Sequence, residues 1–184
     1  MQRRSSRSRP EQRPAVREGG PRPPRSSSGD ADPLARAIGL LARRAHSQSE
    51  LRRKLRLKGY EAPAIEATIA QLTELGYLDD RAFASGLVRR RGALRGPMAL
   101  AAELAAKGVA RPDAEAAVAE FDPEAQLAAA TRLAERLYAR KPPAGYREML
   151  DGVGTKLLRR GFSSAIVRAA CRSVLAEAVQ HTED

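Results

Sequence analysis

The sequence predicts an all-α fold: three tandem three-helix repeats that form an elongated, curved body, preceded by a disordered basic tail. Three observations support this prediction. Residues that favour strands are scarce, helix start and stop signals follow one another closely from residue 34 onward, and one pattern of residues recurs at a regular interval. Aromatic residues make up 4% of the 184 residues and tryptophan is absent. The core should therefore consist of Leu, Ala, Val and Ile, which suit helices better than sheets.

Residues 1–33 should form the disordered tail. They contain eight Arg, four acidic residues, six Pro and six Ser, and almost no apolar side chain whose burial could offset the entropy of ordering. A loose basic tail adds solubility or a weak, salt-sensitive attraction to polyanions. Its Arg and Ser content is also typical of a transit peptide, but the six prolines argue against the amphipathic helix that such a peptide needs.

Capping residues predict nine helices in the rest of the chain. Asp32 and Pro33 place an N-cap before a first-turn proline, Ser47 and Glu50 form a capping box, and glycines or prolines end most segments. The expected helices span about residues 33–46, 47–59, 63–76, 79–91, 97–108, 112–121, 123–142, 146–160 and 163–179.

Helical spacing assigns apolar residues to buried faces. The first helix should bury Leu34, Ile38 and Leu41. The fourth helix should bury Phe83 and Leu87, with Leu94 as a further candidate. His46 should lie in the last turn of the first helix, where a histidine complements the helix dipole or caps the helix end.

The expected eighth helix, residues 146–160, contains Gly152 and Gly154. Each glycine should cost about 1 kcal/mol relative to alanine, so we expect this helix to start later than its equivalents or to fray. The segment GVGTK, residues 152–156, lacks the spacing of a phosphate-binding loop and follows no strand, so we reject that interpretation.

Three stop glycines reveal an internal repeat. Gly59, Gly108 and Gly161 are separated by 108 − 59 = 49 and 161 − 108 = 53 residues. A basic residue precedes each glycine and an apolar residue follows it. Apolar residues also lie eight and four positions before each glycine. Six and ten positions after it lie apolar residues again, among them one alanine and one cysteine. The matching sets are Lys58, Lys107 and Arg160; Tyr60, Val109 and Phe162; Leu51, Leu100 and Val153; Leu55, Leu104 and Leu157; Ile65, Ala114 and Val167; and Ile69, Val118 and Cys171. The expected repeats are residues 34–76, 77–121 and 122–184. Units this small should stack on one another to be stable.

The formal net charge of +11 and the pI of about 10.7 predict attraction to nucleic acid, to an anionic membrane or to an acidic protein surface. No stretch approaches the roughly 18–20 apolar residues of a membrane span, and the N-terminus has no apolar region typical of a secretory signal. Cys171 is the only cysteine, which excludes an intrachain disulfide and fits a reducing compartment.

The residues predict no catalytic site, no metal site and no cofactor. His46 and His181 are far apart in the sequence. Asp79 and Asp80 could hold a metal or act as an acid–base pair, but an N-cap and a first-turn anion explain them better. Cys171 lies on a core stripe, where packing is a better explanation than nucleophilic chemistry.

Clusters of basic residues are the candidate contacts with an anionic partner. They comprise Arg52, Arg53, Lys54, Arg56 and Lys58 on the second helix; Arg89, Arg90, Arg91 and Arg95 around the end of the fourth; Lys107, Arg159 and Arg160 at the later corners; and, in the last repeat, Arg168 and Arg172. A solvated helix face, or a cation that complements the dipole of a helix end, is the alternative explanation, and it stays open for the cations before the three glycines. Arg52, Arg53 and Arg56 face away from the apolar stripe and lack a nearby acidic partner in the sequence, which favours partner binding. With so few aromatic residues, stacking on bases is not expected.

Four segments taken together resemble the RecX family of bacterial recombination regulators. They are SQSELRRKLRLKGY, LGYLDDRAFA, RGPMALAAELAAKGV and KLLRRGFSSAIV, which occur in the family's order. The resemblance spans roughly residues 34–178 and leaves out the basic tail. It implies the same fold of three tandem three-helix repeats.

The same resemblance implies a function. RecX-like proteins are cytoplasmic, non-enzymatic modulators of recombination, DNA repair and the SOS response that bind along the groove of the RecA filament on single-stranded DNA. They suppress its ATPase, strand-exchange and co-protease activities. We therefore expect a monomer whose partners are the RecA filament, single-stranded DNA and, through the same basic faces, duplex DNA. The alternative is a general basic DNA-binding helical protein of the nucleoid type.

Overall fold

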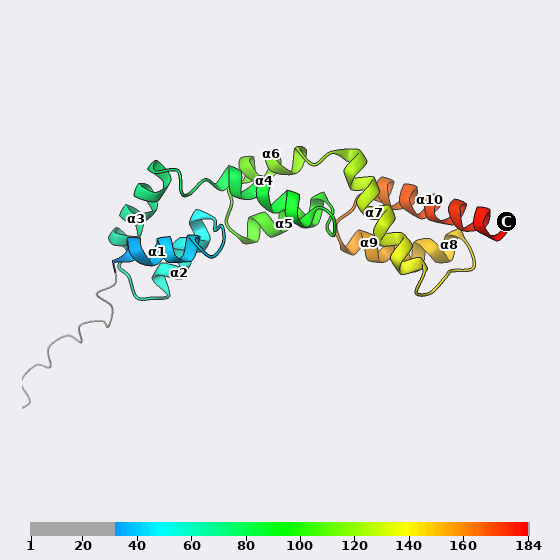
Figure 1. Ribbon diagram of the computed structural model, residues 1–184, viewed down its shortest axis with the longest axis horizontal. Helices are drawn as coiled ribbons and strands as arrows, with labels where there is room; N and C mark the ends of the chain where they lie inside the picture. Colours follow the sequence, from blue (N-terminus) through cyan, green and yellow to red (C-terminus); the bar gives the residue numbers. More distant parts are fainter. Residues whose placement is uncertain (1–31, 184) are drawn as a thin grey trace, which may run out of the picture. The chain divides into compact units, whose positions relative to one another are not determined.

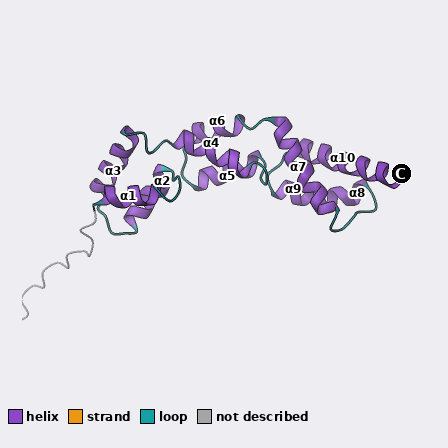
Figure 2. Ribbon diagram, in the orientation of Figure 1, coloured by secondary structure: helices purple, strands orange, loops and turns teal. Residues whose placement is uncertain are grey.

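A computed structural model describes residues 32–183, and within this range all regular secondary structure is helical (Figures 1 and 2). Nearly all of the predicted disordered tail lies outside the described residues. The all-helical prediction is confirmed for the rest.

The helices follow the order expected from the capping residues. They are α1 (Pro33–Leu41), α2 (Gln48–Arg56), α3 (Ala62–Glu74), α4 (Asp80–Arg91), α5 (Pro97–Ala106), α6 (Arg111–Ala119), α7 (Pro123–Tyr138), α8 (Tyr146–Met149), η1 (Leu150–Gly154), α9 (Thr155–Arg159) and α10 (Ser164–Glu183). The side chains of Asp32, Ser47, Asp79 and Asp122 each accept a hydrogen bond from a backbone amide in the first turn of the helix that follows. These caps fix where α1, α2, α4 and α7 begin.

Each group of three helical segments has a hydrophobic core of its own, and this confirms the three-repeat architecture. The first core contains Leu51, Leu55, Ile65, Ile69 and Leu72; the second contains Phe83, Leu87, Leu100, Leu104 and Val109; and the third contains Met149, Val153, Leu157, Phe162 and Cys171. None of these three clusters of buried described residues crosses from one repeat into the next. The residue limits of the repeats stay a prediction.

The repeated glycines are the corners between the second and third helices of each repeat. Gly59, Gly108 and Gly161 have φ angles of 87°, 72° and 85°, which only glycine adopts without strain. At Gly59, the glycine amide bonds the carbonyl of Arg56 and the next amide bonds the carbonyl of Leu55. The same two bonds recur at the other two corners, so all three are Schellman motifs.

Three expectations for the first and fourth helices are wrong. Helix α1 ends at Leu41, and its fully buried residue is Ala37, whereas Ile38 is 49% exposed. His46 therefore lies in the loop after α1 and not in its last turn. Helix α4 ends at Arg91, so Leu94 lies in the following turn and is 45% exposed.

The helical segment that contains Gly152 and Gly154 starts earlier than its equivalents and does not fray. It begins at Tyr146, 15 residues before its corner glycine, whereas α2 and α5 begin 11 residues before theirs. The two glycines belong to η1, a π-helical turn between α8 and α9. A π turn absorbs additional residues without ending a helix, so Val153 and Leu157 keep their places in the core.

Candidate partner-binding surface

Two joints between repeats bring together basic side chains that come from different repeats. In both joints, the glycine corner of one repeat meets the start of the second helix of the preceding repeat. We call them joint 1–2, where the Lys107–Gly108 corner meets the start of α2, and joint 2–3, where the Arg160–Gly161 corner meets the start of α5.

Joint 2–3 is made by the backbone. The amide of Gly96 donates to the carbonyl of Arg160 at 2.8 Å, and the amide of Met98 donates to the carbonyl of Gly161 at 3.2 Å. Free amides at the start of α5 thus satisfy free carbonyls at the end of α9. A Cβ atom on Gly96 would collide with the backbone of Gly161, and one on Gly161 with the backbone of Ala99. The two backbone segments can approach this closely because neither glycine has a side chain.

Joint 1–2 is made by side chains. The hydroxyl of Ser47 donates to the carbonyl of Lys107 at 2.6 Å while it accepts the amide of Glu50 at 3.1 Å. The amide of Gln48 donates to the carboxylate of Asp80 at 2.8 Å. The predicted N-cap role of Asp79 is confirmed, whereas Asp80 joins the start of α4 to the start of α2.

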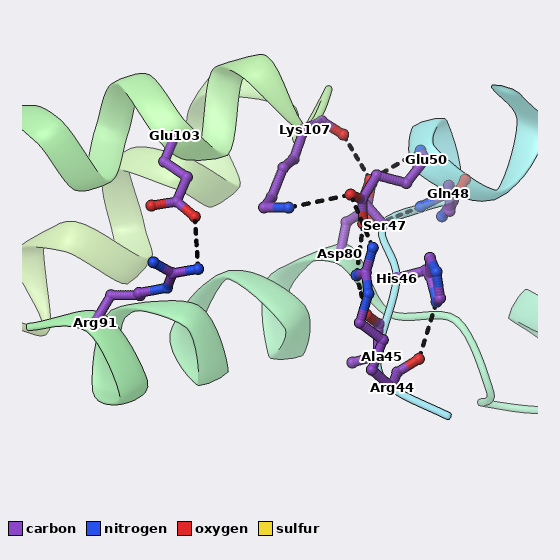
Figure 3. A network of polar contacts seen from close by, with 10 residues as sticks. All are labelled: Arg44, Ala45, His46, Ser47, Gln48, Glu50, Asp80, Arg91, Glu103 and Lys107. Carbon is purple, nitrogen blue, oxygen red and sulfur yellow. Dashed lines mark hydrogen bonds and ion pairs between the residues drawn. The ribbon is translucent and has the colours of Figure 1, made fainter. Parts of the chain in front are cut away.

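Glu50 is the charged centre of joint 1–2 (Figure 3). Its carboxylate is 6% exposed and lies 3.0 Å from Lys107 Nζ and 3.1 Å from Arg44 Nη1. Burial alone would raise the pKa of Glu50, but the hydrogen bonds from Arg44 and Lys107 outweigh it and lower the pKa to about 2. The carboxylate is therefore ionised at neutral pH and holds two cations from different repeats.

His46 lies buried beside this network. Its Nδ1 atom is 2.9 Å from the carbonyl of Arg44, so Nδ1 must carry the proton that is donated there. Burial lowers the pKa of His46, and the nearby charge of Arg44 acts in the same direction. A neutral ring that orients the Arg44 backbone replaces the predicted dipole role.

The basic cluster on α2 is only partly available to a partner. Arg52 was predicted to lack an acidic partner, and this is wrong, because its Nε atom lies 3.0 Å from a carboxylate oxygen of Glu66 on α3. Arg53, Arg56 and Lys58 are exposed, and none of them forms an ion pair with another described residue. Lys54 is half-buried.

The structure brings together basic residues that lie far apart in the sequence. A hollow of about 460 Å³ at joint 2–3 is lined by Arg91, Leu94, Arg95, Arg159 and Arg160, and we call it the arginine hollow. Arg160 Nη1 donates to the carbonyl of Leu94 at 3.2 Å.

A second hollow at joint 1–2 also involves Arg91. Its lining includes Arg44, Arg90, Arg91 and Lys107 together with Glu103. Two of these cations, Arg44 and Lys107, form ion pairs with Glu50. Lys107 therefore has a role inside the protein that requires no external partner. Arg89 lines a separate groove between α4 and α7.

No group of three or more His, Cys, Asp and Glu side chains in the described residues could hold a metal ion. Cys171 is fully buried, as predicted, and burial raises the pKa of its thiol. The thiol is thus protonated at neutral pH and packs in the core. None of the helices within residues 32–183 is long and apolar enough to cross a membrane.

Sequence comparison agrees with the architecture. Residues 34–72 match a model of the first three-helix domain of RecX, and residues 79–118 match a model of the second. The regulatory protein RecX of Xanthomonas axonopodis pv. citri is 38% identical over 141 residues, which cover 76% of this chain and 86% of the relative. This chain belongs to the RecX family.

Other RecX proteins show the same relationship. That of Stenotrophomonas maltophilia strain K279a is 38% identical over 76% of this chain and 85% of its own length. A crystal structure of RecX from Lactobacillus salivarius superposes with a TM-score of 0.71 at 25% identity, covering 77% of this chain and 94% of that one. A crystal structure of a regulatory protein RecX superposes with a TM-score of 0.68 at 28% identity, covering 74% of this chain and 69% of that one. The RecX fold therefore extends over most of this chain.

Sequence reasoning missed the joints themselves. One signal was present: Ser47 and Gly96 both lie 12 residues before the corner glycine of their own repeat, 59 − 47 and 108 − 96. Both are small residues at a helix start, and both bond the residue before the next corner glycine. Comparison of this position across the repeats could have identified it as the place where repeats meet.

Proposed function

We propose that this RecX-family protein regulates RecA as an inhibitor, by binding along the RecA filament on single-stranded DNA. Family membership is the observation that carries the proposal. The exposed basic residues support it, because a nucleoprotein filament presents a dense row of phosphates as well as protein surface.

In this mechanism the protein acts by occupancy and without catalysis, cofactor or metal. Three repeats, each with its own core, would span neighbouring RecA subunits, with basic side chains against acidic RecA surface and DNA phosphates. Occupancy of the groove would block filament growth, DNA pairing and the subunit motions coupled to ATP turnover. Suppressed ATPase, strand-exchange and co-protease activities would follow. A monomer in the bacterial cytoplasm suffices for this mechanism.

The joints between repeats suit such binding. Each consists of a few polar contacts between separately packed cores, so adjacent repeats are held by hydrogen bonds and ion pairs more than by a shared hydrophobic interior. Basic residues on α2, such as Arg53, Arg56 and Lys58, are exposed on the first repeat, and the arginine hollow lies at joint 2–3. One molecule thereby presents positive charge on more than one repeat.

The test is titration of the purified protein into RecA-coated single-stranded DNA with ATP, while ATP hydrolysis is followed. Inhibition at well below one protein per RecA protomer is the expected result. If ATP hydrolysis stays unchanged while the protein binds naked duplex DNA tightly and with steep salt dependence, the protein is a general DNA-binding protein and the proposal is wrong.

A further inference from the structure

We propose that the arginine hollow at joint 2–3 binds successive phosphodiester groups of a single DNA strand. The inference rests on the proposed function in that it names the part of the protein that meets DNA. It assigns a DNA contact to the second and third repeats.

The first support is charge that the protein itself does not neutralise. Four arginines and no acidic residue line the hollow. The nearest acidic side chain is Glu103, whose carboxylate lies 3.8 Å from Arg91 and 3.7 Å from Arg95. One carboxylate for four guanidinium groups leaves a charge of −1 + 4 = +3 at a single joint.

The second support is the state of the hydrogen bonds around Glu103. Its distances to Arg91 and Arg95 are longer than those of hydrogen bonds, and its Oε2 atom is buried without a hydrogen-bond partner in the described part of the chain. The two guanidinium groups therefore keep donors free. The side chain of Arg159 forms no hydrogen bond or ion pair with a described residue, and the side chain of Arg160 uses one donor on the carbonyl of Leu94. An anion entering the hollow would meet donors that are already gathered there.

The chemistry of the lining favours phosphate. All four cations are arginines, whose planar group bonds two oxygens of one phosphate at once. Leu94, which is 45% exposed between them, offers an apolar contact for a sugar. No aromatic side chain lines the hollow, so bases have no stacking platform and recognition would be independent of sequence. A protein that acts on a filament assembled on any DNA needs this kind of contact.

Acidic protein surface is the competing ligand. Three uncompensated charges in one hollow match a polyanion that carries a charge at every nucleotide. Carboxylates packed at that density repel one another and take up protons, so a protein surface supplies such a row less readily. The observations therefore favour the DNA backbone.

The test compares two double variants of the full chain that lower the net charge equally, from +11 to +9. Arg95→Gln with Arg159→Gln removes charge from the hollow. Arg132→Gln with Arg140→Gln removes it from exposed positions on and just after α7, outside the hollow. Affinity for a fluorescent oligo-dT strand is measured by anisotropy at several salt concentrations without RecA, and circular dichroism checks that each variant is folded.

The hollow variant should bind about tenfold more weakly, and the slope of log affinity against log salt should fall by about 1.4, or 0.7 for each lost phosphate contact. The α7 variant should change affinity by less than about twofold. Equal losses in both variants would show a general charge effect and overturn the proposal. So would unchanged DNA affinity in a hollow variant that no longer inhibits RecA, because the hollow would then bind protein. If wild-type protein binds DNA through the hollow but leaves RecA hydrolysis unaffected, the site stands and the proposed function fails.

Discussion

The two joints place equivalent residues in the same geometry by different chemistry. Ser47 at joint 1–2 and Gly96 at joint 2–3 each donate a hydrogen bond to the carbonyl before the next corner glycine. Ser47 uses its hydroxyl, whereas Gly96 uses its backbone amide. The bond at joint 1–2 therefore comes from a side chain and the bond at joint 2–3 from the backbone. Both corner glycines are closely packed, because a Cβ atom on Gly108 would collide with the side chain of Ser49 and one on Gly161 with Ala99.

The difference predicts different vulnerabilities. Joint 2–3 depends on close backbone approach and should be sensitive to any added atom. Joint 1–2 depends on a buried carboxylate between two cations and should be sensitive to charge and to pH. The corner at Gly59 has the same left-handed backbone but no neighbouring repeat, and a Cβ atom there would meet nothing within 4 Å. It provides a matched control for both joints.

The largest effect should come from Gly161→Ala. At Gly59→Ala the left-handed backbone alone should lower the free energy of unfolding by about 1–2 kcal/mol. Gly161→Ala adds a collision with Ala99, for which overpacking costs about 1–3 kcal/mol more, or about 2–5 kcal/mol in total. Urea unfolding followed by circular dichroism measures both. Equal losses in the two variants would mean that joint 2–3 does not depend on close approach.

Glu50→Gln should have the next largest effect, at joint 1–2. It removes the negative charge between Lys107 and Arg44 and should lower the free energy of unfolding by about 1–3 kcal/mol. The control is Glu66→Gln, which weakens an exposed ion pair with Arg52 and should change stability by less than about 1 kcal/mol. Similar small effects in both variants would argue against Glu50 as the centre of the joint.

The stability difference between wild type and Glu50→Gln should also depend on pH. The pKa of Glu50 falls from 4.5 to about 2 in the folded protein, so its contribution is fully present above about pH 4.5 and is lost as the pH falls toward 2. Glutamine does not titrate. The stability difference between wild type and Glu50→Gln should therefore narrow between pH 5 and pH 2. A difference that stays constant over this range would contradict the pKa assignment.

Ser47→Ala should have a smaller effect. It removes the cap of α2 and the bond to the carbonyl of Lys107, and should lower the free energy of unfolding by about 0.5–2 kcal/mol. Asp122→Ala removes only the cap of α7. If Ser47 contributes to the joint, Ser47→Ala should be the more destabilising of the two in thermal unfolding. Equal changes in melting temperature would show that Ser47 stabilises the protein only as the N-cap of α2.

The corners were predictable from sequence because the rule that places glycine there is local. A left-handed residue at a helix end requires glycine, and its apolar neighbours follow from helical spacing. The joints were not predictable in the same way, because Lys107 and Glu50 are 57 residues apart. Their pairing depends on how repeats stack, which no local pattern encodes.

The errors have two origins, one in contacts between helices and one in a missing local signal. Arg52 was judged against acidic residues close to it in the sequence, but Glu66 lies 14 residues away on the helix that packs beside α2. For His46, the absence of a glycine stop after Leu41 hid the true end of α1. The basic clusters were found individually, whereas their assembly into the arginine hollow required the fold.

The early start of the segment from Tyr146 to Arg159 changes the surface that the third repeat offers to a further repeat. Each corner meets the second-helix start of the repeat before it, at the position 12 residues before that repeat's own glycine. In the third repeat this position is Met149, which is fully buried within the helical segment. A fourth unit would find neither a hydroxyl nor a bare backbone amide to bond. An additional repeat, or a second molecule adding head to tail, would therefore need a joint of different chemistry from the two that the protein contains.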